Sequence, residues 1–237
     1  MNPVTIILPV YKGKEMTEKC LESIDKNTRY SYEIIIIEDE INNDDYLSYF
    51  LFSNVKTVIT RKEKLGPISA YNLGMRIAKG NVLLTQNDVE FPDMIEDLKD
   101  NKGCWLTRLV NKSKEENVGM VGCLNSVNKI EQPIDFVGTW CMFIPRTTIN
   151  KIGYFDESFG LAMMDDIDYS RRVIINGFKI DVEKSFEIRH ESSATLKQLG
   201  KEKVEELKRN AAKIYEAKWA DFKENMTKEE IKKYDYW

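Results

Sequence analysis

Four apolar segments in the first hundred residues constrain the fold of this chain more than any other feature. They are VTIILPV (4–10), EIIIIED (33–39), NVKTVIT (54–60) and NVLLTQN (81–87). Helical stretches separate them, one with Met16, Cys20 and Ile24 on one helical face and one from about Gly66 to Lys79, with Pro67 in its first turn. Apolar strands that alternate with helices are typical of a parallel sheet covered on both faces.

The residues that follow these strands are the first candidates for a binding site, because ligands of such sheets bind at the carboxyl ends of the strands. The four ends read Pro9-Val10-Tyr11, Glu38-Asp39, Arg61-Lys62 and Gln86-Asn87-Asp88. Two of the four carry carboxylates, which is unusual for a site that binds phosphate directly. The pattern suits a site that binds phosphate through a metal ion.

Composition narrows the class of protein. The chain has 237 residues and a net charge of −4, which suits one large α/β domain or two small ones and gives no general attraction to nucleic acid or anionic lipid. No apolar run approaches the ~18 residues needed to cross a bilayer, and no signal peptide is expected. The four cysteines are far apart and there is one histidine, so we expect free thiols in a reducing cytoplasm rather than a zinc site.

The regular alternation loosens after about residue 103. We predict strands at 118–124, 135–145 and 178–190, and a short helix around Thr147–Ile152. A helix that begins at Pro92 and carries Ile95 and Leu98 is expected before them. A longer helix should begin near Asp165 and end near Asn176, closed by Gly177.

The tail from about Leu196 is predicted to be an amphipathic helix. One helical stripe contains Val204, Leu207, Ala211, Ile214, Lys218 and Phe222. Only Lys218 breaks the apolar pattern, and Thr227-Lys-Glu-Glu230 has the form of a capping box for a last short helix. Packing on the preceding domain is the default for such a stripe, while a homodimer contact and a peripheral membrane contact are alternatives.

Three carboxylates stand within four positions in the segment LAMMDDIDYS (161–170). Like charges this close raise the pKa of one another, which costs free energy. Acidic residues in a first helical turn favour the helix dipole, and this explains such a cluster without any chemistry. A catalytic carboxylate is the competing interpretation.

Common nucleotide and hydrolase signatures are missing from the sequence. There is no GxxxxGK[ST] phosphate loop, no GxGxxG after the first strand and no GxSxG nucleophile motif. An α/β sheet with acidic strand ends and a single histidine therefore favours metal-assisted chemistry on a phosphorylated substrate.

The order of the motifs resembles glycosyltransferase family 2, whose members are inverting enzymes with the GT-A fold. The matching blocks are ILPVYKG, EIIIIED, GPISAYNLGMRIAKGNVLLTQNDVEF, GTWCMFIPRTTINKIGYFDESFG and DDIDYSRRV, followed by His190. The style of the motifs is closest to rhamnosyltransferase-like members, and the resemblance covers about residues 4–195. Five blocks in the expected order are far more specific than any one of them.

The resemblance implies an α/β, Rossmann-like GT-A fold with a mixed, mainly parallel sheet flanked by helices and a C-terminal helical extension. We expect a catalytic domain at 1–195 and an amphipathic tail at 196–237. The nucleotide-binding half would span about 1–100 and the acceptor half about 101–195. Loops 103–117 and 125–135 are the candidates for acceptor choice.

The resemblance also assigns substrate-binding roles to residues of the first half. They are Pro9, Val10, Tyr11, Asp39, Lys64, Gly66 and Asn72. Tyr11 would stack on the nucleotide base, and Asp39 would accept a hydrogen bond from it. The alternatives are a core-edge aromatic for Tyr11, a turn aspartate for Asp39 and a helix-packing amide for Asn72. The family usually reads Asp-Asp-Gly-Ser after the second strand, so Glu38-Asp39-Glu40-Ile41 departs from it.

Gln86-Asn87-Asp88 occupies the place of the family's DxD motif. Asp88 keeps the metal-binding carboxylate, while Gln86 is neutral and lowers the expected affinity for the ion. Mn²⁺ or Mg²⁺ would neutralise charge on the leaving diphosphate. His190 matches a family histidine near the metal, although a lone histidine is more often structural.

Asp165-Asp166 occupies the place of the family's Glu-Asp pair beside the acceptor. Attack at an anomeric carbon needs a base for the acceptor hydroxyl proton, and Asp166 is the candidate. Asp165 would hold the acceptor, while Asp168 caps the helix or pairs with Arg171 or Arg172.

The activity implied is hexosyl-type, metal-dependent transfer from a UDP-, dTDP- or GDP-linked sugar to a hydroxyl of a glycan or glycoconjugate. Two other functions stay open: a degenerate member that binds nucleotide sugar without catalysis, and a sugar-1-phosphate nucleotidylyltransferase. The latter needs a Gly-rich loop after the first strand, which is missing.

Overall fold

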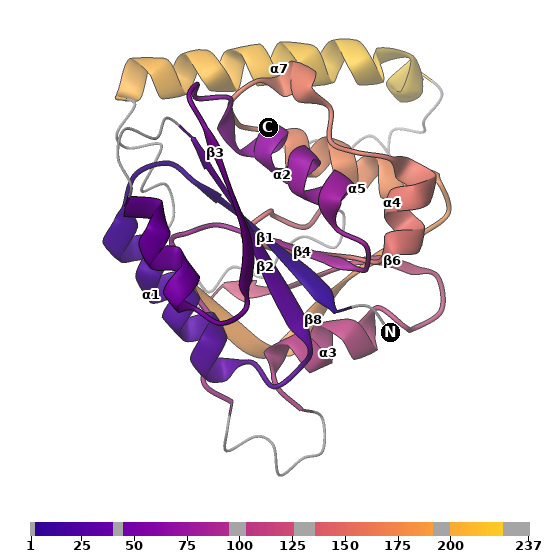
Figure 1. Cartoon of the computed structure of the whole chain (residues 1–237). Coiled ribbons are helices and arrows are strands. Elements are labelled where there is room, and N and C mark those ends of the chain that lie inside the picture. Colours follow the sequence, from indigo (N-terminus) through magenta and orange to yellow (C-terminus); the bar gives the residue numbers. More distant parts are fainter. Residues whose placement is uncertain (1–2, 40–44, 95–102, 126–135, 192–199, 225–237) are drawn as a thin grey trace.

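The computed structural model describes residues 3–39, 45–94, 103–125, 136–191 and 200–224. Its centre is a mixed eight-stranded sheet with the strand order β3-β2-β1-β4-β7-β6-β8-β5. Helices cover both faces of this sheet, and the long C-terminal helix α7 (Lys201–Glu224) crosses one end of the molecule (Figure 1).

The first half of the chain forms the parallel part of the sheet. Its strands are β1 (Val4–Val10), β2 (Tyr32–Asp39), β3 (Val55–Arg61) and β4 (Val82–Thr85). Ile6 lies opposite Ile34 on one side and Leu83 on the other, so the three strands end at one edge. All four strands confirm the prediction from the sequence, and so does the mixed sheet flanked by helices.

The second half adds the antiparallel part. Strand β7 (Cys141–Ile144) runs antiparallel to β4 and to β6 (Val118–Asn125). Strand β8 (Lys179–His190) lies parallel to β6, and its end pairs with the short β5 (Val89–Glu90). Because β5 follows β4 directly, this pairing brings the end of β8 beside the end of β4.

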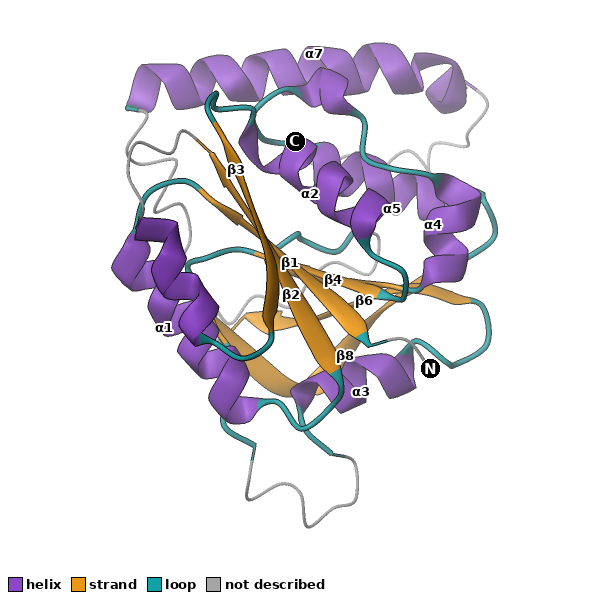
Figure 2. Cartoon of the chain, in the orientation of Figure 1, coloured by secondary structure: helices purple, strands orange, loops and turns teal. Residues whose placement is uncertain are grey.

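Successive residues of β1 point into two separate cores. Ile6 and Leu8 face the core covered by α1 (Lys14–Asn27) and α3 (Trp105–Lys112). Ile7 faces the core on the other side of the sheet. The helices of that second side are α2 (Gly66–Ile77), α4 (Arg146–Ile152), α5 (Asp165–Ile175) and α7 (Figure 2). Two 3₁₀ turns complete the described elements, η1 (Asp45–Leu51) and η3 (Glu157–Phe159).

The segment 103–117 corrects one prediction, because it contains helix α3 and not only a loop. Trp105, Leu106 and Leu109 of α3 are buried in the first core. The helix is only eight residues long, and buried Arg108 interrupts its apolar pattern, so its periodicity was too short to recognise. The strand predicted at 135–145 is likewise shorter and spans only Cys141–Ile144.

Other predictions fall partly or wholly outside the described residues. These are the Pro92-led helix from residue 95 onward, the loop at 126–135, the Phe222 side chain and the Thr227–Glu230 capping box.

The C-terminal helix packs on the rest of the chain along a face that only partly coincides with the predicted stripe, since Val204, Leu207 and Ile214 are half-buried. Ala211 and two aromatic residues beside that stripe, Tyr215 and Trp219, are buried in the second core. Within the described part of the chain, no helix is long and apolar enough to cross a membrane.

Candidate active site

The end of β4 is fixed by hydrogen bonds to the loop that precedes β7. The Thr85 hydroxyl donates to the Trp140 carbonyl (2.9 Å), and Gln86 Nε2 donates to Thr139 Oγ1 (3.2 Å). Asn87 turns the other way, since its Nδ2 donates to Thr17 Oγ1 on α1 (3.0 Å) and to the Lys12 carbonyl (3.4 Å). Asn87 therefore supports the turn after β1.

Asp88 and His190 meet where β5 pairs with β8. His190 lies opposite Val89 in that pair, and its Nε2 is 3.3 Å from Asp88 Oδ1 and 3.1 Å from Gln86 Oε1. Trp140 stacks on the imidazole with ring centroids 5.5 Å apart. The structure thus brings His190 beside Gln86, 104 positions away in the sequence, and beside Asp88. The sequence predicted Asp88 and His190 as metal ligands and Gln86 as a substrate-binding residue.

The Asp88–His190 pair fits a divalent cation. Asp88 Oδ1 is buried and accepts no hydrogen bond from any of the described residues, which is costly for a carboxylate oxygen unless something else satisfies it. Two neighbouring ligands of an octahedral ion, each at about 2.1 Å, lie about 3.0 Å apart, close to the separation of Asp88 Oδ1 and His190 Nε2. When Nε2 carries no proton, its lone pair is available to an ion. Among the described residues, no cluster of three or more histidine, cysteine or carboxylate groups forms a metal cage, so further ligands would come from the substrate or water.

A pocket of about 520 Å³ adjoins Asp88 on the side of α1. Its walls come from the start of α1, the end of β4 and the end of β8, and they carry the charged residues Lys14, Lys19, Glu90 and Glu191. The pocket gives Asp88 an open approach beside the buried pair.

The end of β2 is organised around Asp39. This buried carboxylate accepts hydrogen bonds from Arg61 Nε and from the Gly66 backbone N–H (2.8 Å). Arg61 in turn donates to Ser69 Oγ and to the Gly66 carbonyl. Asp39 therefore shapes the turn between β3 and α2, and its remaining lone pairs can still accept a hydrogen bond from a ligand.

Gly66 has a backbone conformation and a packing contact that another residue would disturb. Its φ is +83°, and a Cβ there would lie 3.2 Å from the backbone of Leu161. The turn beneath Asp39 thus contacts the segment that leads to Asp165.

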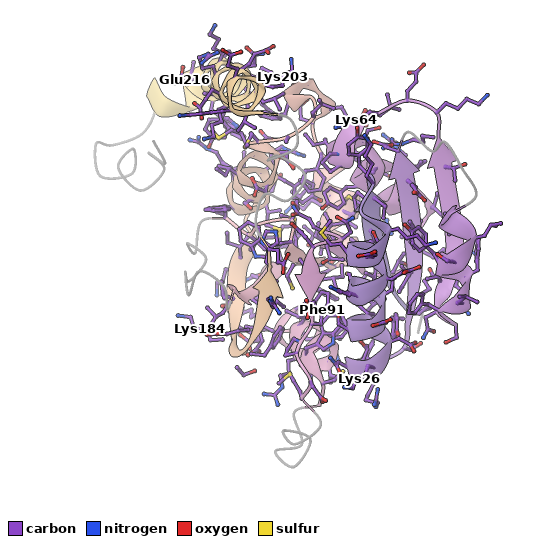
Figure 3. The ribbon with its side chains drawn as sticks, turned by 90° about the vertical axis from the view of Figure 1, so that its left-hand side faces the viewer. Lys26, Lys64, Phe91, Lys184, Lys203 and Glu216 are labelled. Atoms are coloured by element: carbon purple, nitrogen blue, oxygen red, sulfur yellow. The ribbon has the colours of Figure 1, made fainter. Side chains whose placement is uncertain are left out.

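The end of β1 leaves Tyr11 accessible, while Val10 is buried in the first core and Pro9 is half-buried. The Lys64 ammonium lies 3.6 Å from the centre of the Tyr11 ring, a cation–π contact. Figure 3 shows Lys64 at the end of the molecule where α7 lies and Lys26 at the opposite end. After Tyr11 the chain turns through Lys12 and Gly13, both with positive φ.

Asn72 uses its whole amide group in packing. Its Nδ2 donates to the Phe155 carbonyl (3.0 Å) and to Glu157 Oε1 (2.8 Å), and its Oδ1 accepts from the Phe155 N–H (2.8 Å). Asn72 therefore links α2 to the segment around Phe155 by hydrogen bonds, in line with the helix-packing alternative.

Asp165 and Asp166 open α5 after a strained turn. Met163 and Met164 have φ values of 83° and 65°, which bulky side chains rarely adopt. Asp165 is buried and Asp166 is half-buried, with its Oδ1 accepting from the Ile167 N–H (2.9 Å). Strain of this kind persists where surrounding contacts enforce it, often at functional sites.

The pKa values of both carboxyls are raised. Burial raises the pKa of Asp165 most, and the neighbouring charge of Asp166 adds to it. Burial also raises the pKa of Asp166, to about 6. The pair therefore holds a proton more readily than free aspartates do, and a carboxylate with a pKa near 6 is a stronger base than an ordinary one.

Tyr71 is a buried residue of α2 that contacts the end of β4. Its hydroxyl donates to the Thr85 carbonyl (3.1 Å), just before Gln86. Burial raises the pKa of Tyr71, and the charges of Asp165 and Asp88 raise it further.

Asp168 has a separate role in packing. Its fully buried carboxylate accepts from Arg172 Nε (2.9 Å), as one alternative from the sequence predicted. It also accepts from Trp219 Nε1 (3.0 Å) and pairs with Lys218 Nζ (2.9 Å), both on α7.

Several site residues were missed by the sequence reasoning. Thr139 and Trp140 contact Gln86 and His190, Tyr71 donates to the end of β4, and Lys218 and Trp219 bind Asp168. Thr139 and Trp140 lie in the GTWC motif. Lys218 was indicated by the break that it makes in the apolar stripe of the tail.

Comparisons with known proteins agree with this geometry. The sequence profile described as glycosyl transferase family 2 matches residues 5–164. An uncharacterized glycosyltransferase of Rickettsia typhi (strain ATCC VR-144 / Wilmington) is 26% identical over 247 residues, covering 96% of this chain and 74% of the relative.

Two solved structures have a similar fold. The mannosyltransferase PcManGT from Pyrobaculum calidifontis, in complex with GDP-Man and Mn²⁺, matches with a TM-score of 0.63 and 18% identity over 80% of this chain and 57% of that one. GalNAc-T7 with UDP, GalNAc and Mn²⁺ matches with a TM-score of 0.62 and 14% identity over 80% and 44%. This chain therefore spans about half the length of these two proteins.

The likeness confirms the GT-A type of fold that the sequence predicted. Because the family profile covers well over half of the sequence, the chain belongs to glycosyl transferase family 2, a family of glycosyltransferases.

Proposed function

We propose that this glycosyltransferase moves a sugar from a nucleotide-diphosphate donor to an acceptor hydroxyl in one inverting displacement. A UDP-, dTDP- or GDP-linked sugar is the donor, and a glycan or glycoconjugate supplies the hydroxyl. The observation that carries the proposal is the pair of Asp88 and His190 at the end of β4, whose Oδ1 and Nε2 atoms lie 3.3 Å apart. Asp165 and Asp166, in the first turn of α5, are the carboxylates proposed for the acceptor.

The donor would lie along the carboxyl ends of β1, β2 and β4. The accessible ring of Tyr11 offers a surface for the base, and Asp39 offers free lone pairs at the neighbouring strand end. Lys64 and Lys12 bring positive charge to the same edge, where the diphosphate is expected. Gln86 can bind a ribose hydroxyl without adding charge.

Asp88 and His190 would hold the divalent ion, Mn²⁺ or Mg²⁺. When bound, the ion supplies positive charge next to the departing diphosphate. The two similar structures are complexes with Mn²⁺ and a nucleotide or nucleotide sugar, which supports this assignment by fold likeness.

Asp166 takes the proton of the attacking hydroxyl. It is the more exposed member of the carboxylate pair, so an acceptor can reach it, while buried Asp165 has its pKa raised further and stays protonated. A protonated Asp165 can donate a hydrogen bond to the acceptor. Attack from the side of Asp166, opposite the departing diphosphate, inverts the anomeric centre.

A panel of nucleotide sugars tests this function. Wild-type protein would be incubated with UDP-, dTDP- and GDP-sugars with Mn²⁺, Mg²⁺ or EDTA, and binding and slow donor hydrolysis would be scored by release of the nucleoside diphosphate. We expect one class of donor to bind and hydrolyse only with a metal ion. Binding of a donor without hydrolysis or transfer under any condition would instead favour the degenerate, non-catalytic alternative.

A further inference from the structure

One lysine of the C-terminal helix contacts both ends of the segment that carries the proposed base. Lys218 Nζ lies 2.6 Å from Asp156 Oδ2 and 2.9 Å from Asp168 Oδ1. The segment between these two aspartates contains η3, the strained pair Met163-Met164 and both Asp165 and Asp166.

The Asp168 end of this contact is fully buried, and its charge is matched. Asp168 has no exposed surface and accepts from Arg172, Lys218 and Trp219. A buried carboxylate is stable only when it is paired and hydrogen-bonded in this way. Removal of one partner therefore changes the geometry around it more than a surface contact would.

The Asp156 end lies nearer the surface and also organises the turn that follows it. Asp156 Oδ1 accepts from the Ser158 N–H (3.0 Å), which starts η3. The Lys218 ammonium also lies 5.6 Å from the centre of the Phe159 ring in the same turn. Lys218 thus contacts η3 through one carboxylate and one aromatic ring.

Other contacts hold parts of the same segment. Asn72 donates to Glu157 at its beginning. Phe159, Met164 and Ile167 are buried in the second core. Met163 and Met164 nevertheless have positive φ values, and such a conformation persists only where the surrounding contacts enforce it. Lys218 adds a contact that joins the two ends of this turn.

We propose that Lys218, supported by Trp219, is a positioning element of the active site: it links Asp156 to Asp168 and thereby fixes the turn that presents Asp165 and Asp166. The C-terminal helix is then part of the catalytic machinery, although its residues do not touch the substrate. The claim that this link affects turnover rests on the proposed function, whereas the claim that it fixes the turn does not depend on that function.

The test compares Lys218→Met with Lys208→Met in the full chain. Lys208 lies on the same helix and pairs with Glu205 on its exposed side, so its removal is a matched control. Hydrogen–deuterium exchange needs no substrate and reports on the segment itself. We expect faster exchange of amides within 157–168 in Lys218→Met, unchanged exchange in β1–β4, and no change in either region in Lys208→Met.

Turnover tests the catalytic half with the donor found by the panel. In Lys218→Met, kcat should fall about 10- to 100-fold because the base is misplaced, while donor affinity stays within about twofold. A partial return of kcat is expected in Lys218→Arg, which keeps a cation that can reach two carboxylates.

Asp156→Asn gives a second route to the same link, and because Asp156 lies near the surface, this variant should fold if Lys218→Met does not. If Lys218 acts by joining the two aspartates, Asp156→Asn alone should lower kcat, and the double variant should be little worse than either single one.

Unchanged exchange within 157–168 in Lys218→Met or Asp156→Asn would overturn the proposal. Faster exchange with undiminished kcat would also overturn it, since the link would then be structural only. Failure of the proposed function is recognised separately, because the wild-type protein would then neither hydrolyse nor transfer any donor of the panel, whatever the exchange data show.

Discussion

The donor side and the base side of this site are built in different ways. Tyr11 directly follows β1, Asp39 is the last residue of β2, and Asp88 lies shortly after the end of β4. Short-range order and one sheet edge therefore bring them together. Asp165 and Asp166 lie at the start of helix α5, which Lys218 and Trp219 of α7 contact through Asp168. Asn72 holds the segment before that helix, at Phe155. The sheet edge is a common scaffold, whereas the base side depends on long-range packing that this chain supplies for itself.

This comparison predicts its largest effect at Asp166. Asp166→Asn keeps size and some hydrogen bonding but removes the proton acceptor, so donor binding should survive while kcat falls about 10²- to 10⁴-fold. Steady-state transfer and donor titration would be measured on the same preparation. Asp181→Asn, which alters a half-exposed aspartate paired with Lys112, is the matched control and should stay near wild type. Near wild-type transfer by Asp166→Asn would move the base to Asp165.

A somewhat smaller effect is expected at Asp88, on the donor side. Asp88→Ala removes the buried oxygen next to His190, so the metal-dependent part of donor affinity should fall by about 10- to 100-fold or more. Calorimetric titration of the donor with and without Mn²⁺ checks this. Circular dichroism should show an intact fold. A metal-dependent affinity equal to wild type would remove Asp88 from the site.

Asp168 should affect stability more than chemistry. Asp168→Asn removes the buried charge that Arg172, Lys218 and Trp219 share, and we expect a loss of about 2–3 kcal/mol in the free energy of unfolding. Urea unfolding measures it. A loss below about 0.5 kcal/mol would show that the link between α5 and α7 contributes little.

The smallest predicted effect is a gain in stability at Asp165. Its folded pKa is raised above the ordinary value, so its contribution to stability is complete below about pH 4 and is lost as the pH rises through the folded pKa. Asp165→Asn stays neutral, and it should raise the melting temperature at pH 8, by the equivalent of about 1 kcal/mol, with little change at pH 4. Thermal unfolding of the wild type and Asp165→Asn at pH 4 and pH 8 measures this difference. An equal shift of the melting temperature at both pH values would contradict the raised pKa of Asp165.

The same comparison explains how much could be predicted from the sequence. The strands β1 to β4 were predictable because each is a mostly apolar run in a regular alternation, and Asp88 was predictable from its place after the fourth run. The start of α5 was predictable from Asp165 and the end from Gly177. Each of these signals lies within or next to the element that it predicts, so a single sequence is enough to recognise it.

On the base side, individual residues could be singled out in the sequence, but the distant residues that they contact could not be predicted. Lys218 broke an apolar stripe, but its partner Asp156 lies 62 positions away, and the indole of Trp219 reaches Asp168 over 51 positions. The role of Asn72 depended on Phe155, which is 83 positions distant. Helix α3 was missed because eight residues give too few turns for a clear period.

The pH dependence of transfer tests the central claim most directly, because the claim is that a carboxylate with a raised pKa removes the acceptor proton. With donor, acceptor and Mn²⁺ defined, kcat/KM of the wild-type enzyme would be measured from about pH 4.5 to 8.5. We predict that kcat/KM rises tenfold per pH unit below about pH 6, because burial raises the pKa of Asp166 to about 6. It should then level off until about pH 8, where Asp165, whose pKa burial raises to about 8, begins to lose its proton. A profile that is flat between pH 5 and 7, with the fold intact, would contradict Asp166 as the base.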